Sequence, residues 1–195
     1  MAGDAEATRG RLLEAATAEF SARGLAGARV DRIAAAAGSN KAQIYHYFGS
    51  KDGLFTAVFD AIVTRTTTDV PIDVDDLPGY AGRLHDSYAA RPEVQRIAAW
   101  HRLEHSGSDP REGTAGGGRV RSIQDANRAK VEAIAAAQAD GRLPERWSAA
   151  ELLGLVLQIS TLWHAAVPEL DDLTAGSARH RRDVVVDAVR RLLAD

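Results

Sequence analysis

The sequence predicts an all-α fold, in which a small N-terminal domain at residues 1–60 precedes a larger helical domain at residues 61–195. Apolar residues recur every three or four positions through most of the 195 residues, which is the spacing of one helix face. Glycine and proline separate these periodic segments. The strict alternation of a strand is almost absent. About nine helices are therefore expected.

The N-terminal domain contains four helical segments, and the short second and third segments flank Gly38. Gly24 precedes an apolar residue, which is typical of a helix C-terminus, so the first helix should end there. Asn40 is a good N-cap, and Gln43 stands three residues later, as in a capping box. The expected helices are 8–23, 30–37, 40–48 and a fourth that begins after Ser50. Two short helices around a glycine predict a helix-turn-helix.

The larger domain begins after an acidic segment with two prolines, residues 69–79, which is typical of a linker or a corner between domains. Five more helical segments follow. Ser148 and Glu151 form a capping box at the start of one of them. The expected helices are 76–91, 92–106, 119–140, 148–167 and 177–194.

The composition excludes several classes of protein. The chain has no cysteine, so it has no disulfide and no thiolate metal site, and no cofactor is expected. It has no apolar signal segment at its start and no apolar run near the roughly 20 residues of a membrane helix. A cytoplasmic protein without membrane contact is therefore expected. The formal net charge is −3, so any nucleic-acid binding must depend on the placement of individual charges.

The segment SNKAQIYHYFGSKDGLF, residues 39–55, combines polar and aromatic side chains on one short helix. At about 100° per residue, Ile44 and Phe48 face the core. The other side presents Ala42, Gln43, Tyr45, His46 and Tyr47. Such a face fits the major groove, where side chains near the start of a helix contact base edges. Lys51 opposes the dipole of the next helix unless a phosphate lies there.

Three motifs resemble the N-terminal domain of TetR-family transcriptional regulators: RIAAAAG at 32–38, IYHYF at 44–48 and SKDGLF at 50–55. The resemblance implies a repressor rather than an enzyme. Such a repressor binds a palindromic operator in double-stranded DNA as a homodimer, and a small-molecule effector releases it. The resemblance also implies base contacts from Lys41, Ala42 and Gln43. It implies contacts with the DNA backbone from Arg29, Tyr45, His46, Tyr47 and Lys51.

The sequence departs from the pattern of that family at three positions. Arg29 stands where the second helix usually has a serine or threonine cap. Asp31 stands where a neutral or basic residue is frequent, and its charge would repel a phosphate. Ser39 replaces a small apolar residue in the turn. These departures are expected to weaken the contacts made by the first turn of the second helix.

Two helices of the larger domain, 148–167 and 177–194, are apolar on more than one side, so each needs two partners. One partner can be the core, and the other a second subunit. The predicted dimer contacts are Leu152, Leu155, Val156, Ile159, Val185, Val189 and Leu192. The predicted lining of an effector site among the middle helices is Tyr88, Trp100, His101, Leu103, His105 and Trp163.

Two other interpretations stay open. HRLEH at 101–105 matches the H-x-x-E-H pattern of zinc proteases, so His101, Glu104 and His105 are a remote candidate for a metal site. Such a site would also need a third ligand and a roomy cleft. The second alternative is a helical dimer that acts through protein contacts without binding DNA, which the neutral first domain and Asp31 favour.

Overall fold

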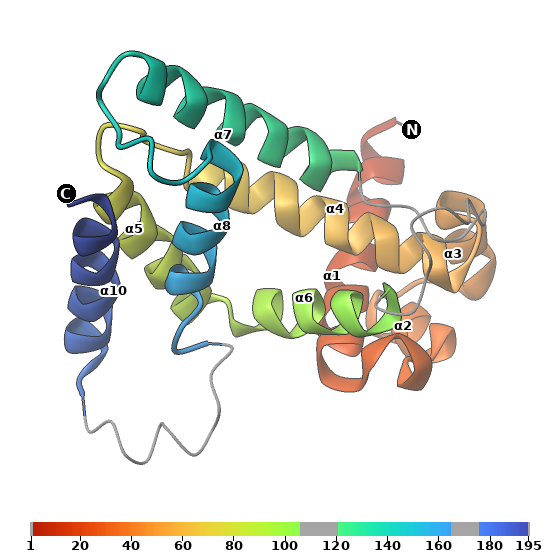
Figure 1. Cartoon of the computed structure of the whole chain (residues 1–195). Helices are drawn as coiled ribbons and strands as arrows, with labels where there is room; N and C mark the ends of the chain where they lie inside the picture. Colours follow the sequence, from red (N-terminus) through yellow and green to blue (C-terminus); the bar gives the residue numbers. More distant parts are fainter. Residues whose placement is uncertain (1, 106–120, 165–175, 195) are drawn as a thin grey trace. The chain divides into compact units, whose positions relative to one another are not determined.

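The chain is all-α in the computed structural model, which describes residues 2–105, 121–164 and 176–194 (Figure 1). The described residues form nine helices and no strand, which confirms the predicted fold class. The helices are α1 (Ala2–Gly27), α2 (Val30–Ala36), α3 (Lys41–Phe48), α4 (Lys51–Asp69), α5 (Leu77–Ala90), α6 (Pro92–His105), α7 (Arg121–Ala139), α8 (Ala149–Ser160) and α10 (Ala178–Leu193). No helix in the described ranges is long and apolar enough to cross a membrane.

The described residues group into two compact units. The first contains residues up to Thr64 together with α6 from Glu93 onward, and the second contains 65–92 and the helices after Ile123. Helix α4 begins in the first unit and ends in the second. The boundary between functional domains at residues 60 and 61 stays a prediction.

The first unit is built around an apolar core beneath α2 and α3. Phe20 and Phe55 meet edge to face, with ring centroids 5.1 Å apart. Other fully buried members are Leu12, Ile33, Ile44, Leu54 and Val58. Removing this much apolar surface from water gives the short α2 and α3 a stability that seven or eight residues of helix lack in isolation.

The helical backbone of α1 is interrupted at Gly24, where the sequence predicted a helix end, and a short helical segment follows as far as Gly27. Gly24 has φ +66°, a conformation that side-chain-bearing residues rarely adopt. A Cβ at this position would lie 2.9 Å from the indole of Trp100 on α6. The glycine is therefore required twice, by its backbone conformation and by the close approach of the ring.

The second unit packs α5, α8 and α10 against one another. Its core includes Leu77, Tyr80, Leu84, Ile134, Leu152, Val156, Val185 and Val189. The capping box predicted at the start of α8 is confirmed, because Ser148 and Glu151 exchange side-chain and backbone hydrogen bonds. Helix α8 ends at Ser160, earlier than expected, and residues 161–164 continue as a turn.

Candidate functional site

Helices α2 and α3 form the predicted helix-turn-helix. Gly38 has φ +59°, which lets the chain reverse between them, and the Ser39 amide donates to the Ala34 carbonyl at 2.9 Å. Ile44 is fully buried beneath α3. This anchoring leaves the other side of α3 exposed.

The exposed face of α3 carries the side chains that were predicted to contact DNA. Those of Lys41, Ala42, Gln43, Tyr45 and His46 are exposed, and Tyr47 is half-buried with its ring 5.3 Å from that of His46. Phe48, which was expected to face the core, is half-buried. The Arg9 guanidinium lies 5.7 Å from the centre of its ring, so a cation covers part of the phenyl face.

Gln43 has a hydrogen-bonding arrangement that the sequence did not indicate. Asn40 caps α3 by accepting from the Gln43 amide at 3.0 Å. The Gln43 side chain does not return to Asn40, as a capping box requires. Its Oε1 instead accepts from the Ser39 hydroxyl at 2.5 Å. The side-chain acceptor of Gln43 is therefore engaged within the protein, while Nε2 keeps its two N–H donors.

Lys41 is paired with an acid on the preceding helix. Its Nζ lies 2.5 Å from Oδ1 of Asp31, and both side chains are more than half exposed. The aspartate that departs from the family pattern thus neutralises the first cation of α3. Surface pairs of this kind contribute about 0–1 kcal/mol to stability, so the main effect of this pair is on local charge.

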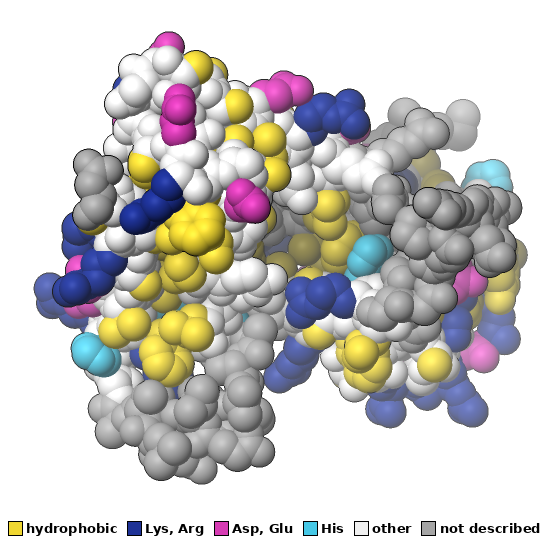
Figure 2. All heavy atoms as spheres, in the orientation of Figure 1, with side chains coloured by type: hydrophobic (Ala, Val, Ile, Leu, Met, Phe, Trp, Pro, Cys, Tyr) yellow, Lys and Arg dark blue, Asp and Glu magenta, His cyan; other side chains and the backbone are white. Residues whose placement is uncertain are grey.

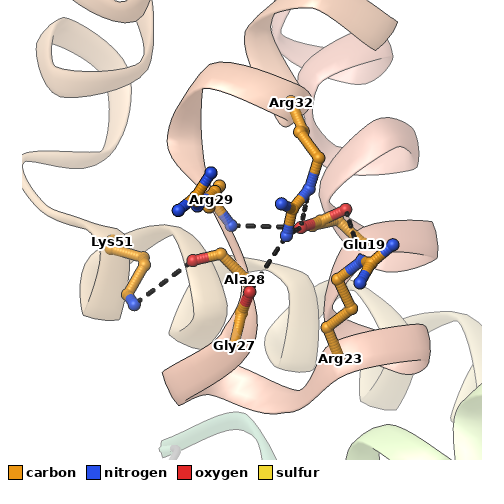
Figure 3. Close-up of polar contacts among 7 residues, drawn as sticks. All are labelled: Glu19, Arg23, Gly27, Ala28, Arg29, Arg32 and Lys51. Carbon is orange, nitrogen blue, oxygen red and sulfur yellow. Dashed lines mark hydrogen bonds and ion pairs between the residues drawn. The ribbon is translucent and has the colours of Figure 1, made fainter.

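The start of α2 is held by Glu19 from α1 (Figure 3). Glu19 Oε1 accepts from the Arg29 backbone N–H at 3.0 Å and from Arg32 Nε at 2.8 Å, and also from Arg32 Nη2. Arg32 in turn donates to the Gly27 carbonyl at 3.0 Å. Glu19 thus satisfies the backbone N–H of the N-cap residue, as the glutamate of a capping box does, whereas no side chain caps the next N–H groups of α2. The hydrogen bond from Arg32 is the main cause that lowers the pKa of Glu19.

Lys51 is half-buried at the start of α4. Its Nζ donates to the Ala28 carbonyl at 3.4 Å, as Figure 3 shows. This contact ties the loop before α2 to the beginning of α4. The side chain therefore has a structural partner in addition to its predicted role at a phosphate.

The residues predicted to line an effector site come from both units. Trp100 and His101 belong to the first unit, where the His101 ring stacks 4.1 Å from Phe59. Leu103 is 67% exposed. Tyr88 and Trp163 belong to the second unit, and the Trp163 indole N–H donates to the Arg181 carbonyl at 3.3 Å. The side chain of His105 lies outside the described residues.

The second unit contains a group of buried polar side chains that the sequence analysis missed. Lys130 on α7 is 9% exposed, and its Nζ lies 5.9 Å from the ring centre of Tyr80 on α5. His164 Nε2 lies 3.1 Å from both Nδ1 and the carbonyl oxygen of His85, and burial lowers the pKa of each histidine. A usable signal was present, because Lys130 occupies the same helical stripe as the buried Ile134 and Ala137.

The predicted dimer contacts divide into two sets. Four of them are fully buried within the chain itself and are core residues, out of reach of a second subunit: Leu152, Val156, Val185 and Val189. Three remain half-buried on the flanks of α8 and α10: Leu155, Ile159 and Leu192. The spacing of apolar residues along a helix does not distinguish those buried in the core of the same chain from those left available to a second subunit.

The described part of the chain contains no group of three metal-ligating side chains. The side chains of Glu104 and His105 in the HRLEH motif lie outside it. Charges of both signs are interspersed over the face drawn in Figure 2, which agrees with the small net charge of the chain.

Comparison with known proteins gives matches over nearly the whole chain. Residues 12–58 match the family model of bacterial regulatory proteins of the tetR family, and residues 76–191 match the tetracyclin repressor-like C-terminal domain. The HTH-type transcriptional repressor SCO4008 of Streptomyces coelicolor is 36% identical over 97% of this chain and 95% of its own. The repressor NicS of Pseudomonas putida is 36% identical over 54% of this chain and 53% of its own. The crystal structure of SCO4942 from Streptomyces coelicolor is similar with a TM-score of 0.81 and 35% identity, covering 95% of this chain and 97% of that chain.

Proposed function

This chain belongs to the TetR family of transcriptional regulators, and from that premise we propose that it is a repressor that reads a palindromic operator with α3 and leaves it when a small molecule binds. TetR regulators bind DNA and act as dimers, and they are not enzymes. The operator, the release by a ligand and the roles of single residues are the proposal. The observation that carries it is the exposed polar face of α3 above the buried Ile44.

The residues of the first turn of α3 contact the bases. Ala42 is small enough for the backbone to approach the groove, and Lys41 reaches guanine acceptors once Asp31 is displaced. Gln43 offers mainly its Nε2 donors, because its oxygen already accepts from Ser39. An acceptor on the base, such as N7 or O6 of guanine, therefore suits Gln43 better than the two-sided pairing that glutamine makes with adenine.

Phosphate contacts flank the base-reading turn. Tyr45 and His46 are exposed on α3, Tyr47 is half-buried beside them, and each can donate a hydrogen bond to the DNA backbone. The exposed side chain of Arg29 and the half-buried Lys51 supply positive charge at the starts of α2 and α4. These groups hold the helix in register without selecting a sequence.

A second copy of the chain meets the half-buried flanks of α8 and α10, where Leu155, Ile159 and Leu192 lie. The fully buried residues beneath them keep these helices in place. Two copies present two α3 helices to successive major-groove turns, which matches a palindromic operator. An effector that favours another spacing of the two helices weakens DNA binding, and DNA weakens effector binding by the same factor.

The test is fluorescence anisotropy of the purified protein on DNA from upstream of its own gene, with a scrambled duplex, at about 0.15 M salt. We expect tight binding to the upstream duplex alone. Gln43→Ala should cost about 1–3 kcal/mol on the operator and little on the scrambled duplex. Gln158→Ala is the matched control, since Gln158 is an exposed glutamine on α8. Equal losses on both duplexes for Gln43→Ala would remove its base-reading role.

A further inference from the structure

Lys130 is the only one of the described Lys, Arg, Asp and Glu side chains to be buried in the chain. It lies on α7 one turn before Ile134, which is fully buried. Lysine is almost never fully buried unless it is paired. A buried lysine at this position suggests that the second unit uses its positive charge.

No described group supplies the missing negative charge. None of the buried polar residues is an aspartate or glutamate, and no ion pair of Lys130 occurs within the described ranges. Among the described residues, its aromatic neighbour is Tyr80, whose ring centre lies 5.9 Å from Nζ, near the outer limit of a cation–π interaction. Desolvation lowers the pKa of Lys130, and no neighbouring charge opposes that shift. The ammonium form thus has no negatively charged partner among the described residues.

The phenol groups beside Lys130 are incompletely satisfied as well. Tyr80 is fully buried, and its hydroxyl has no hydrogen-bond partner in the described structure. Tyr88 stands two turns later on α5 and is also buried. Burial raises the pKa of both phenols, so both are neutral donors at pH 7. The Lys130 ammonium group and the Tyr80 hydroxyl, a donor without a partner in the described structure, therefore lie in the same part of the second unit.

We infer that Lys130 and Tyr80, with Tyr88 beside them, bind the carboxylate of a small organic acid that has an apolar body. The single cation matches a single negative charge, and the Tyr80 hydroxyl donates to a carboxylate oxygen. Leu84 and Ile134, each one helical turn from these residues, are buried and apolar, which suits the rest of such a molecule. This inference rests on the proposed function, because it names the chemical class of the effector.

The experiment is calorimetric titration of the full chain at pH 7 with benzoate, phenylacetate and octanoate. The uncharged amides of the same three acids are titrated in parallel. At least one acid should bind about tenfold or more tightly than its amide, because the acid alone supplies the missing charge. Lys130→Met should abolish that preference, and Tyr80→Phe should reduce it. Arg128→Met is the matched control, since Arg128 is an exposed cation on the same helix, and it should keep the preference.

Thermal unfolding without any ligand gives a second readout. Lys130→Met should raise Tm, because it replaces an unpaired buried charge with an apolar side chain. Tyr80→Phe should leave Tm equal or higher, because its hydroxyl has no partner to lose. A Lys130→Met protein that is less stable or does not fold overturns the inference, since it assigns the lysine a structural role. Failure of all three acids to bind better than their amides overturns it too.

Adding the preferred acid to the protein–operator complex separates this inference from the proposed function. Calorimetry and thermal unfolding need no DNA, so they report on the acid site alone. An acid that binds through Lys130 but leaves the operator occupied refutes the effector role and keeps the site. An acid that releases the operator from the wild type but not from the Lys130→Met variant supports both.

Discussion

Replacing Glu19 with glutamine should destabilise the helix-turn-helix, because this carboxylate holds the start of α2. In the wild type it accepts hydrogen bonds from the Arg29 backbone and from Arg32, and its side chain is only 12% exposed. Glutamine has nearly the same shape and keeps one acceptor oxygen. The substitution therefore removes the negative charge while disturbing the packing little.

The expected loss is about 2 kcal/mol of unfolding free energy. A hydrogen bond to a charged group contributes about 1.5–3 kcal/mol, and an ordinary hydrogen bond to a backbone N–H contributes about 0.5–1.5 kcal/mol. The two effects share the same oxygen, so they do not add fully, and the 38% exposure of Arg32 weakens its charge through solvent screening. For a chain of this length, about 2 kcal/mol lowers Tm by roughly 4–8 °C.

The assay is urea and thermal unfolding followed by circular dichroism, with Glu14→Gln as the control. Glu14 is an exposed glutamate on the same helix, so its variant should unfold within about 0.5 kcal/mol of the wild type. A Glu19→Gln variant as stable as the Glu14→Gln variant would refute the reasoning, since the network would then contribute nothing.

The pH dependence gives an independent check of the same network. The pKa of Glu19 is lowered from its ordinary value of 4.5, first of all by the hydrogen bond from Arg32. A lowered pKa means that the stabilisation is present above about pH 4.5 and is lost as the pH falls through the lowered value. The gap in stability between wild type and Glu19→Gln should thus be full at pH 7 and shrink in acid. A gap that widened on acidification would contradict the assigned sign.

Three further substitutions test other parts of the molecule. Asp31→Asn should tighten binding to any duplex and steepen the salt dependence by about one unit, because it frees Lys41 for a phosphate; anisotropy at several salt concentrations would detect no change if the pair were irrelevant. Gly24→Ala should cost about 1–3 kcal/mol in urea unfolding, from the positive φ and the clash with the indole, whereas Gly10→Ala, with open space around it, should be neutral or stabilising. Ser148→Ala should cost about 1 kcal/mol by loss of the capping box, and an unchanged midpoint would show that α8 does not depend on its cap.

Most of the helices followed from local signals in the sequence. The start of α8 was evident from Ser148 and Glu151, and α3 was evident from Asn40 and the spacing of Ile44. These signals act within one or two helical turns, so sequence alone contains them. The break at Gly24 was also predicted from the glycine and the apolar residue after it, but the close approach of Trp100, which stands 76 positions later, was not.

The candidate sites were predicted in part for the same reason. The side chains exposed on α3 followed from helical geometry. The partners of those side chains did not, because Asp31 and Ser39 reach Lys41 and Gln43 across a turn whose shape the sequence did not specify. Lys130 was missed because a lone lysine in a helix is usually solvated, although it shares a helical stripe with Ile134 and Ala137, which are buried.

The ion pair between Asp31 and Lys41 also bears on how a regulator finds one site among millions. Random DNA offers phosphates everywhere, and a free lysine at the tip of the reading helix would be drawn to all of them. At a random site the pair must be given up with no base contact in return, while in the proposed operator complex a guanine takes the place of the aspartate. Under the proposed function, the aspartate therefore lowers the occupancy of non-specific sites more than that of the operator, and fewer copies of the protein are held on other chromosomal DNA.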